Sequence, residues 1–389
     1  MVLVPQSRHY SLDKVADGLG LGQGSLLPVP LNHRFRMDVN ELRGKLHRLA
    51  DEQVPVIAVV SVCGSTEEGA IDELDKIVEI RRELERSRNF TFFLHSDAAY
   101  GGYFTSLLTE GGKKLSEKNF IAQTGLSAEV YRGLSAMRET DSITIDPHKL
   151  GFVPYPAGGI LFRDRTFREL TAFRAPYIFH EGSEDDFIGG HILEGSKPGA
   201  SAAACYLAHK VIPLDSSGYG ALLRGILKGA AMVYEFVKSF RVPGYKIQPL
   251  AEPDTNIVCF VVNREGNRSL KTMNELNWKI YRRFSFHEKP RHPVSAHDFF
   301  LSMTEFNYEL YDSEVIRDLL AAVGIPADSF GETSRENPDR CDRLVVLRMT
   351  AMNPFLRESD YVRQFALGLE EFLTSSFKAG FSGAPPSGW

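Results

Sequence analysis

Two short stretches decide the fold: TFFLHSDAAYGG at Thr91–Gly102 and SITIDPHK at Ser142–Lys149. Each begins with an apolar run rich in β-branched or aromatic residues, which is typical of a buried strand, and each ends in polar groups. Outward from them, PVIAVVSV at Pro55–Val62 is a third run that is apolar on both faces, whereas Ile71–Glu85 has helical spacing. Buried strands that alternate with helices predict an α/β fold whose mostly parallel sheet is covered on both faces.

The polar ends of the two stretches predict a binding site. Ligands of open α/β sheets bind just beyond the carboxyl ends of the strands, and Asp97 and Lys149 follow two such ends. A lysine amine forms a Schiff base with an aldehyde, and a carboxylate keeps the pyridine nitrogen of pyridoxal phosphate protonated. Small Ala99 lets a flat ring lie against the protein, and Gly101 and Gly102 allow a tight turn.

Composition bounds the class of protein. The 389 residues are 43% apolar and 24% charged with a net charge of −5, so a globular chain with a sizeable core is predicted and a basic surface for nucleic acid is not. The four cysteines show no CxxC spacing, so neither disulfides nor a metal site is predicted. The apolar runs are too short for a membrane span and the start is unlike a signal peptide, so we expect a cytoplasmic protein without membrane partners.

The pattern along the chain predicts two domains and a tail. We expect a large domain over residues 1–215, a smaller α+β domain over residues 216–375 and a disordered tail over residues 376–389. The second domain begins with a long helix predicted over Tyr219–Phe240, after which further strands and helices follow. The tail is rich in Gly, Pro and Ser.

Three local features carry expectations of their own. Asp38 and Ser11 are residue types that cap helices, and each precedes or opens a helical pattern. The segment Leu107–Glu139 is polar and lysine-rich at first and has helical spacing later, and we expect it to be a surface insertion.

Taken together, the motifs resemble the group II amino-acid decarboxylases that depend on pyridoxal phosphate. HSDAAYGG followed by DPHK is similar to the motif pair of that family. Further segments resemble the bacterial tyrosine decarboxylase branch: VPQSRHYS at Val4–Ser11, SVCGSTEEGAIDELDKIV at Ser61–Val78, ILEGSKPGASAA at Ile192–Ala203 and VVLRMTAMNPF at Val345–Phe355. The resemblance runs from the first residues to Leu369. It implies the aspartate aminotransferase-like fold (fold type I), with a cofactor-binding large domain and a smaller C-terminal domain.

The resemblance assigns residues to the cofactor ring. Lys149 would hold pyridoxal phosphate as a Schiff base, and His148 would sit beside it near the phosphate. Asp97 would pair with the pyridine nitrogen. Ala99 would pack on one face of the ring and His9 would stack on the other.

Other cofactor contacts are implied by the same resemblance. Ser65 and Thr66 would lie near the cofactor, although turn formation after Gly64 explains a serine there equally well. Ser196 would contact the phosphate bound in a partner subunit.

The resemblance also assigns residues to catalysis and to the substrate. Tyr177 would lie on a mobile loop that reaches the neighbouring subunit and protonates the substrate carbon after CO2 leaves. Tyr155 would line the pocket, and Ser302 would lie near the aromatic hydroxyl group. Arg348 would bind the substrate carboxylate, with a structural arginine at a strand end as the alternative.

The implied activity is decarboxylation of tyrosine or a related aromatic amino acid by a homodimer. Two alternatives stay open: another fold type I carbon–carbon lyase or an aspartate decarboxylase, and an inactive homologue that only binds partners. Family members extend further at the N-terminus, where a Ser/Gly/Thr-rich turn grips the phosphate, and we find no such turn in this chain. We therefore expect an N-terminally truncated large domain with an exposed sheet edge, whose retention of the cofactor is an open question.

Overall fold

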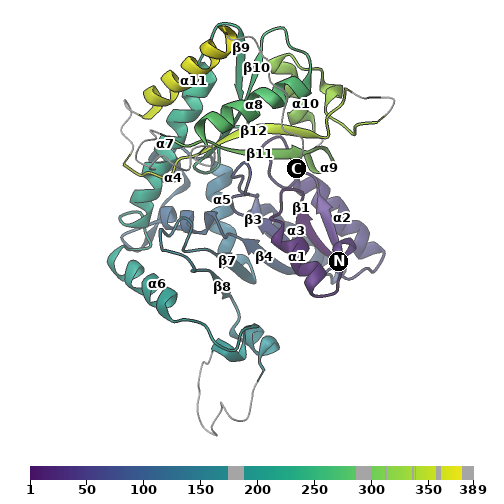
Figure 1. Cartoon of the computed structure of the whole chain (residues 1–389). Coiled ribbons are helices and arrows are strands. Elements are labelled where there is room, and N and C mark those ends of the chain that lie inside the picture. Colours follow the sequence, from purple (N-terminus) through teal and green to yellow (C-terminus); the bar gives the residue numbers. More distant parts are fainter. Residues whose placement is uncertain are drawn as a thin grey trace.

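The structure is a computed structural model that contains two main sheets (Figure 1). It describes residues 1–173, 188–285, 299–311, 313–334, 337, 339–355 and 361–378. Within these ranges no helix is both long and apolar enough to cross a membrane. The same ranges contain no group of His, Cys, Asp or Glu side chains placed to hold a metal ion, and the four cysteines are free thiols.

The larger sheet has six strands in the order β2-β1-β3-β4-β7-β8. These strands are β1 (Val2–Pro5), β2 (Leu26–Val29), β3 (Ala58–Val62), β4 (Phe93–Asp97), β7 (Ser142–Ile145) and β8 (Gly159–Phe162). β8 runs antiparallel to β7, and the other neighbours in this sheet are parallel. The mostly parallel sheet predicted from the apolar runs is therefore confirmed.

Helices cover one face of this sheet. α2 (Val39–Asp51), α3 (Leu74–Arg88) and α5 (Ala128–Ala136) place buried leucines and isoleucines in the same core as Leu3 and Leu94 of the strands. Burial of these apolar side chains is the main force that holds the layers together.

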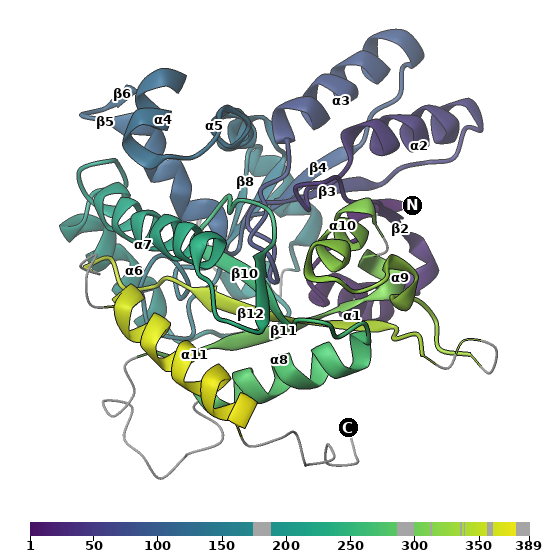
Figure 2. The same cartoon turned by 90° about the horizontal axis from the view of Figure 1, so that it is seen from above.

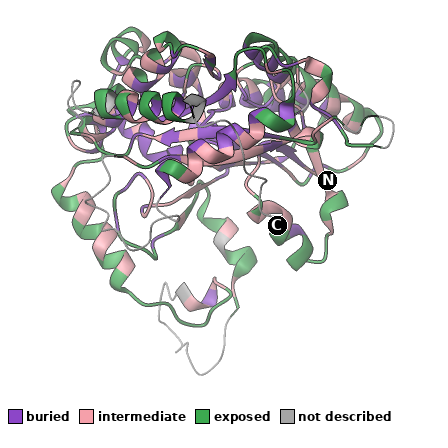
Figure 3. Ribbon diagram, turned by 45° about the horizontal axis from the view of Figure 1, so that its top comes forward, coloured by how far each residue is buried: buried purple, intermediate pink, exposed green. Residues whose placement is uncertain are grey.

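The predicted coverage of both faces is wrong for the edge strand β8, whereas β7 is buried or half-buried. Residues 160–162 of β8 are exposed. The helix α6 (Ala200–Val211), which stands away from the main body in Figure 3, contains no buried residue. Among the described residues, the short 3-10 helix Arg165–Thr171 contacts β8, where the ring of Phe167 stacks at 6.5 Å from that of Phe162, but the apolar side chains of β8 stay exposed.

The two predicted helix caps turn out differently. Asp38 caps α2 as predicted, because its carboxylate accepts hydrogen bonds from the backbone N–H groups of Asn40 and Glu41. The cap predicted at Ser11 is wrong, since α1 (Ser11–Gly18) has Tyr10 at its N-cap position without a side-chain cap.

The surface insertion predicted over Leu107–Glu139 is also wrong. Lys113 and Lys114 lie on a short hairpin, β5 (Thr109–Glu110) with β6 (Lys113–Lys114), but the following helices are part of the core. Phe120 of α4 (Glu117–Thr124) and Leu134 of α5 are buried. The polar hairpin made the whole segment look exposed, although α4 and α5 each have an apolar face that packs into the core.

The second sheet is antiparallel, with the order β11-β12-β10-β9. Its strands are β9 (Tyr245–Pro249), β10 (Ile257–Arg264), β11 (Ser302–Asn307) and β12 (Arg343–Thr350). The helices around it are α8 (Leu270–Phe284), α9 (Tyr308–Tyr311), α10 (Glu314–Val323) and α11 (Tyr361–Lys378). Figure 2 shows α8 and α11 on one side of this sheet. The C-terminal part therefore has the α+β character that the sequence predicted.

One helix belongs to both cores. The first half of α7 (Tyr219–Ser239) packs Leu223 with the parallel sheet, and its second half packs Val233 with the antiparallel sheet. The domain division between residues 215 and 216 stays a prediction, because this helix joins the two units. α11 extends to Lys378, past the predicted start of the tail, and residues 379–389 lie outside the described ranges.

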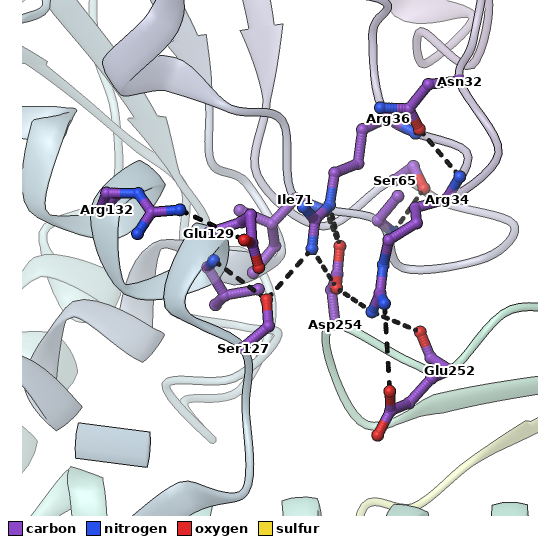
Figure 4. Close-up of polar contacts among 12 residues, drawn as sticks. Asn32, Arg34, Arg36, Ser65, Ile71, Ser127, Glu129, Arg132, Glu252 and Asp254 are labelled. Carbon is purple, nitrogen blue, oxygen red and sulfur yellow. Dashed lines mark hydrogen bonds and ion pairs between the residues drawn. The ribbon is translucent and has the colours of Figure 1, made fainter. Parts of the chain in front are cut away.

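A buried ion pair fastens the two sheets together (Figure 4). Asp254, in the loop before β10, accepts hydrogen bonds of 2.7 Å from both Nε and Nη2 of Arg36, and these side chains are only 3% and 2% exposed. The same carboxylate accepts a 3.1 Å bond from the backbone N–H of Ile71. Bidentate, charge-assisted bonds are the strong kind, so this pair ties the turn after β3 to the second sheet.

We expect Asp254→Asn to lower the free energy of unfolding by about 3 kcal/mol, because the buried Arg36 guanidinium loses its countercharge. Urea unfolding followed by circular dichroism measures the change. The matched control is Glu252→Gln, since Glu252 is 63% exposed and lies 3.9 Å from Arg34. Its loss should stay below about 1 kcal/mol, and equal losses in the two variants would contradict the assignment.

A second buried acid, Glu68, lies in the turn after β3. Burial, together with the neighbouring charge of Glu67, raises the pKa of Glu68 to about 8. The hydroxyl of Tyr311 donates to Glu68 Oε2 at 3.5 Å. An unfolded glutamate has a pKa of roughly 4.3. Between these values the folded state binds more protons than the unfolded state, so the stability contributed by Glu68 is complete at low pH and is lost as the pH rises through about 8.

The expected outcome is that Glu68→Gln, which keeps a neutral side chain at every pH, flattens the fall of the urea midpoint between about pH 5 and pH 8.5. Across this range, the change in the free energy of unfolding should differ between the variant and wild type by an amount on the order of a few kcal/mol. The exposed Glu265 provides the control, and Glu265→Gln should leave the slope unchanged. An unaltered slope in Glu68→Gln would show that another group causes the dependence.

Candidate functional site

A cavity of about 640 Å³ lies at the carboxyl ends of β1, β3, β4 and β7. This is the edge of the sheet at which the sequence predicted a site, and the volume falls in the range of small-molecule pockets. Arg348 of β12 adds a side chain from the second sheet. The cavity is lined by Ser7, His9, Ser11, Leu12, Val15, Val62, Gly64, Ser65, Thr66, His95, Asp97, Ala99, Tyr100, Thr144, Asp146, Lys149 and Arg348.

Asp97 is the last residue of β4, and a backbone N–H of the following turn holds its carboxylate. The backbone N–H of Ala99 donates to Asp97 Oδ1 at 3.2 Å, and both residues line the cavity. The turn continues to Gly101, where a Cβ atom would lie 2.5 Å from the carbonyl oxygen of Cys63. Only glycine permits that approach, so the HSDAAYGG segment packs directly against the end of β3.

Lys149 follows β7 through a tight turn, in which its backbone N–H donates to the carbonyl of Asp146 at 2.9 Å. The lysine Nζ also lies 3.0 Å from Asp146 Oδ2. The backbone N–H of Asp146 in turn donates to the carbonyl of Ala99 at 3.2 Å. The two sequence motifs are therefore joined through the backbone, and the ion-pair partner of Lys149 is Asp146, while Asp97 lines the same cavity.

His9 lies in the turn between β1 and α1, and Ser11 orients its ring. The backbone N–H of Ser11 approaches His9 Nδ1 at 3.3 Å, and the Ser11 hydroxyl lies 2.8 Å from the same nitrogen. Because a backbone N–H can only donate, Nδ1 is the acceptor and the ring proton belongs on Nε2.

Ser65 and Thr66 lie in the turn after β3. Ser65 Oγ accepts a hydrogen bond from the backbone N–H of Ala70 at 2.9 Å, and the Ser65 N–H donates to the Ala70 carbonyl at 3.0 Å. Turn formation therefore explains the buried Ser65 side chain, while exposed Thr66 and Ser65 both contribute to the cavity wall.

Arg348 is held by groups from two different segments. Its Nε donates to the carbonyl of Glu67 at 3.0 Å, and its Nη1 donates to Ser302 Oγ at 3.4 Å. The Ser302 hydroxyl donates to the Arg348 carbonyl at 2.8 Å. Arg348 lines the cavity and Ser302 does not, which separates two residues that the resemblance had assigned together to the substrate.

Some predicted site residues lie away from the cavity wall. His148 donates from Nδ1 to the carbonyl of Ala157, and its ring lies 3.9 Å from that of Tyr155. Tyr155 is 75% exposed, and Ser196 is exposed in the segment before α6. The structure does not bring these three side chains to the cavity wall, and Tyr177 lies outside the described residues.

Six polar cavity residues were not predicted as site residues from the sequence: Ser7, Ser11, His95, Tyr100, Thr144 and Asp146. His95 contacts Ser142 Oγ at 2.7 Å and Thr144 Oγ1 at 3.2 Å, and burial lowers its pKa although the charge of Asp97 opposes this. Burial raises the pKa of Tyr100 to about 12, and its hydroxyl donates to Asn256 at 2.8 Å. Their positions inside or next to the quoted motifs were the available signal.

The donor set fits pyridoxal phosphate. The wall brings together an amine (Lys149), a carboxylate (Asp97), a small side chain beside that carboxylate (Ala99) and a planar imidazole (His9). An aldehyde, a basic ring nitrogen and the two faces of an aromatic ring are what these groups can engage.

Two family models match the chain. A pyridoxal-dependent decarboxylase conserved domain matches residues 1–113, and a tyrosine decarboxylase C-terminal domain matches residues 229–377. The L-tyrosine decarboxylase of Enterococcus faecium is 36% identical over 97% of this chain and 63% of its own length. A probable L-tyrosine/L-aspartate decarboxylase of Methanothermobacter thermautotrophicus is 31% identical over 72% of this chain and 65% of its own length.

A solved structure shares the fold. The crystal structure of Oryza sativa TDC with PLP and tryptamine matches 97% of this chain and 62% of that chain, with a TM-score of 0.66 at 15% identity. The chain thus spans somewhat less than two thirds of the length of the relatives it matches. The matched domains, the relatives and the fold together show that the chain belongs to the family of group II pyridoxal-dependent decarboxylases.

Proposed function

We propose that this chain holds pyridoxal phosphate and decarboxylates L-tyrosine or a related aromatic L-amino acid, releasing the amine and CO2. The observation that carries the proposal is one cavity, at the carboxyl ends of parallel strands, lined by both Lys149 and Asp97. The Enterococcus faecium relative is an L-tyrosine decarboxylase, which supports tyrosine as the substrate.

The cavity residues divide the work of holding the cofactor. Pyridoxal phosphate, when bound, supplies an electron sink for the electron pair left on Cα when CO2 departs. Lys149 would bond to its aldehyde carbon, and Asp97 would hold a proton on the ring nitrogen. His9 and Ala99 would flank the ring. The roles that the resemblance implied also remain part of this proposal: His148 near the phosphate, Ser65 and Thr66 near the cofactor, and Ser196 at the phosphate bound in a partner subunit.

Asp146 would serve Lys149 whenever its amine is not bonded to the cofactor. The 3.0 Å contact between Lys149 Nζ and Asp146 Oδ2 holds the ammonium at the cavity wall. A charge-assisted bond of this length restricts the flexible lysine side chain, so the amine is kept where it can act.

The substrate would be oriented from the second sheet. Arg348 is the guanidinium on the cavity wall, and it would bind the substrate carboxylate as a planar fork. The orientation matters because only a Cα–carboxylate bond perpendicular to the ring passes its electrons into the conjugated system. Tyr177 would supply the proton to Cα, from a loop that also excludes water, and Tyr155 would border the entrance.

Two other functions compete with this one. Aspartate decarboxylation, or another carbon–carbon lyase reaction, would use the same Lys149 and Asp97, and the name of the Methanothermobacter thermautotrophicus relative includes aspartate. A binding protein without catalysis would keep the fold but not the cofactor. Assays with tyrosine, DOPA, glutamate and aspartate distinguish tyrosine decarboxylation from the other lyase reactions. Cofactor absorbance tests whether the chain is a binding protein without catalysis.

We further propose a cytoplasmic homodimer with a large domain over residues 1–215 and a smaller domain over residues 216–375. The exposed apolar residues of β8 and α6 support an assembly larger than the single chain. Size-exclusion chromatography with light scattering tests the dimer.

The proposed function predicts that purified protein incubated with pyridoxal phosphate gains a visible absorbance band and converts tyrosine to tyramine. Lys149→Ala should lose the band and reduce turnover at least about a thousandfold, because the covalent attachment point is gone. Lys118→Ala, at an exposed lysine on α4, should behave as wild type. A wild-type protein with neither band nor amine product would favour the non-catalytic alternative.

Asp97→Asn keeps the shape of the side chain and removes its charge. We expect weaker cofactor retention and a loss of turnover of about a hundredfold or more, since the ring nitrogen loses its anionic partner. Asp146→Asn provides the comparison and should lose less turnover, because Asp146 faces the amine. The measurement is cofactor affinity by absorbance titration together with tyramine production, and equal losses in both variants would overturn the assignment of Asp97 to the ring nitrogen.

A further inference from the structure

Ser302 and Arg348 form a reciprocal pair across two strands. They stand directly opposite each other in the antiparallel pairing of β11 with β12. The Ser302 hydroxyl has one proton, which it donates to the Arg348 carbonyl at 2.8 Å, so its lone pairs are left to receive Arg348 Nη1 at 3.4 Å. The serine thus contacts both the backbone and the side chain of the arginine.

A third group completes this arrangement from the other sheet. The Glu67 carbonyl, in the turn after β3, accepts a 3.0 Å bond from Arg348 Nε. The guanidinium is therefore held between Ser302 Oγ and the Glu67 carbonyl, which we call the arginine bracket. The bracket uses Nε and one N–H of Nη1, and the remaining N–H groups of the guanidinium are available to a planar carboxylate.

The position of Ser302 decides between two roles. Arg348 lines the cavity, whereas Ser302 is absent from its wall although it lies within the described residues. A ring hydroxyl of a substrate in the cavity would need Ser302 on that wall. The serine reaches a ligand only through the arginine that it holds.

We propose that Ser302 is a positioning residue that aims Arg348 at the substrate carboxylate, and that it does not read the hydroxyl of an aromatic substrate. The inference rests on the proposed function for the identity of the ligand carboxylate. Its consequence is that Ser302 affects aromatic amino acids with and without a ring hydroxyl equally. Arginine loses much rotamer freedom when it binds, and the bracket removes that freedom before the ligand arrives.

The test uses equilibrium binding of three non-reactive ligands to the full chain loaded with pyridoxal phosphate. They are 3-(4-hydroxyphenyl)propanoate, 3-phenylpropanoate and 4-ethylphenol, which carry a carboxylate with a hydroxyl, a carboxylate alone and a hydroxyl alone. Ser302→Ala should weaken both propanoates by the same factor, about three- to tenfold, and leave 4-ethylphenol unchanged. Calorimetry or competition against tyrosine turnover provides the dissociation constants.

Four further variants make the result specific. Ser302→Thr keeps the hydroxyl and should restore most of the binding. Arg348→Gln should weaken the propanoates more strongly, and Ser302→Ala added to Arg348→Gln should cause no further loss. Thr304→Ala, two residues along β11 and opposite Val346, is the matched control and should leave all three affinities unchanged.

In turnover, the bracket predicts that Ser302→Ala raises KM for tyrosine and phenylalanine by equal factors with little change in kcat. A loss confined to 4-ethylphenol and 3-(4-hydroxyphenyl)propanoate would overturn the proposal, because it would show direct contact with the hydroxyl. Failure of wild type to prefer the propanoates over 4-ethylphenol would overturn it as well. Equal weakening of the propanoates by Ser302→Ala without any tyramine production would leave the bracket standing and reject the proposed function.

Discussion

Asp254 gives both carboxylate oxygens to Arg36, and the pair is buried where the antiparallel sheet meets the parallel one. The contact also reaches the backbone of Ile71, so it fixes the turn that carries Ser65, Thr66 and Glu67. A pair of charges removed from water must be satisfied on all sides, which leaves little room for the two sheets to slide. The cavity between the sheets keeps its shape for this reason.

Two similar acids at the same edge of the sheet make different contacts. Asp97 and Asp146 both line it, but Asp146 is paired with Lys149 Nζ and Asp97 is held by the Ala99 N–H. The backbone bond between Asp146 and Ala99 sets the two turns side by side. A ring that carries an aldehyde requires an amine and a carboxylate that are not paired with each other. The register of β4 with β7 places such groups at one edge of the sheet.

Arg348 completes this edge from a distant part of the chain. Its side chain crosses from β12 to the cavity, where the Glu67 carbonyl and the Ser302 hydroxyl hold it. Asp254 of the buried ion pair also bonds to the backbone of Ile71, in the same turn as Glu67. Arg348, this turn and the ion pair therefore form one continuous set of contacts. The buried ion pair is thus linked to the cavity wall although Arg36 and Asp254 do not line the cavity.

The sequence by itself determined the parallel sheet, the strand ends that carry Asp97 and Lys149, and the cap at Asp38, because each depends on residues that are close in the chain. It misjudged Leu107–Glu139 and the helical coverage of β8, since burial there depends on segments far away in sequence. Only the tertiary structure decided that Lys149 pairs with Asp146, that Tyr155 is exposed and that Ser302 is hydrogen-bonded to Arg348. Such choices arise where turns and strands from separate segments meet, and local patterns carry no information about which side chains face each other there.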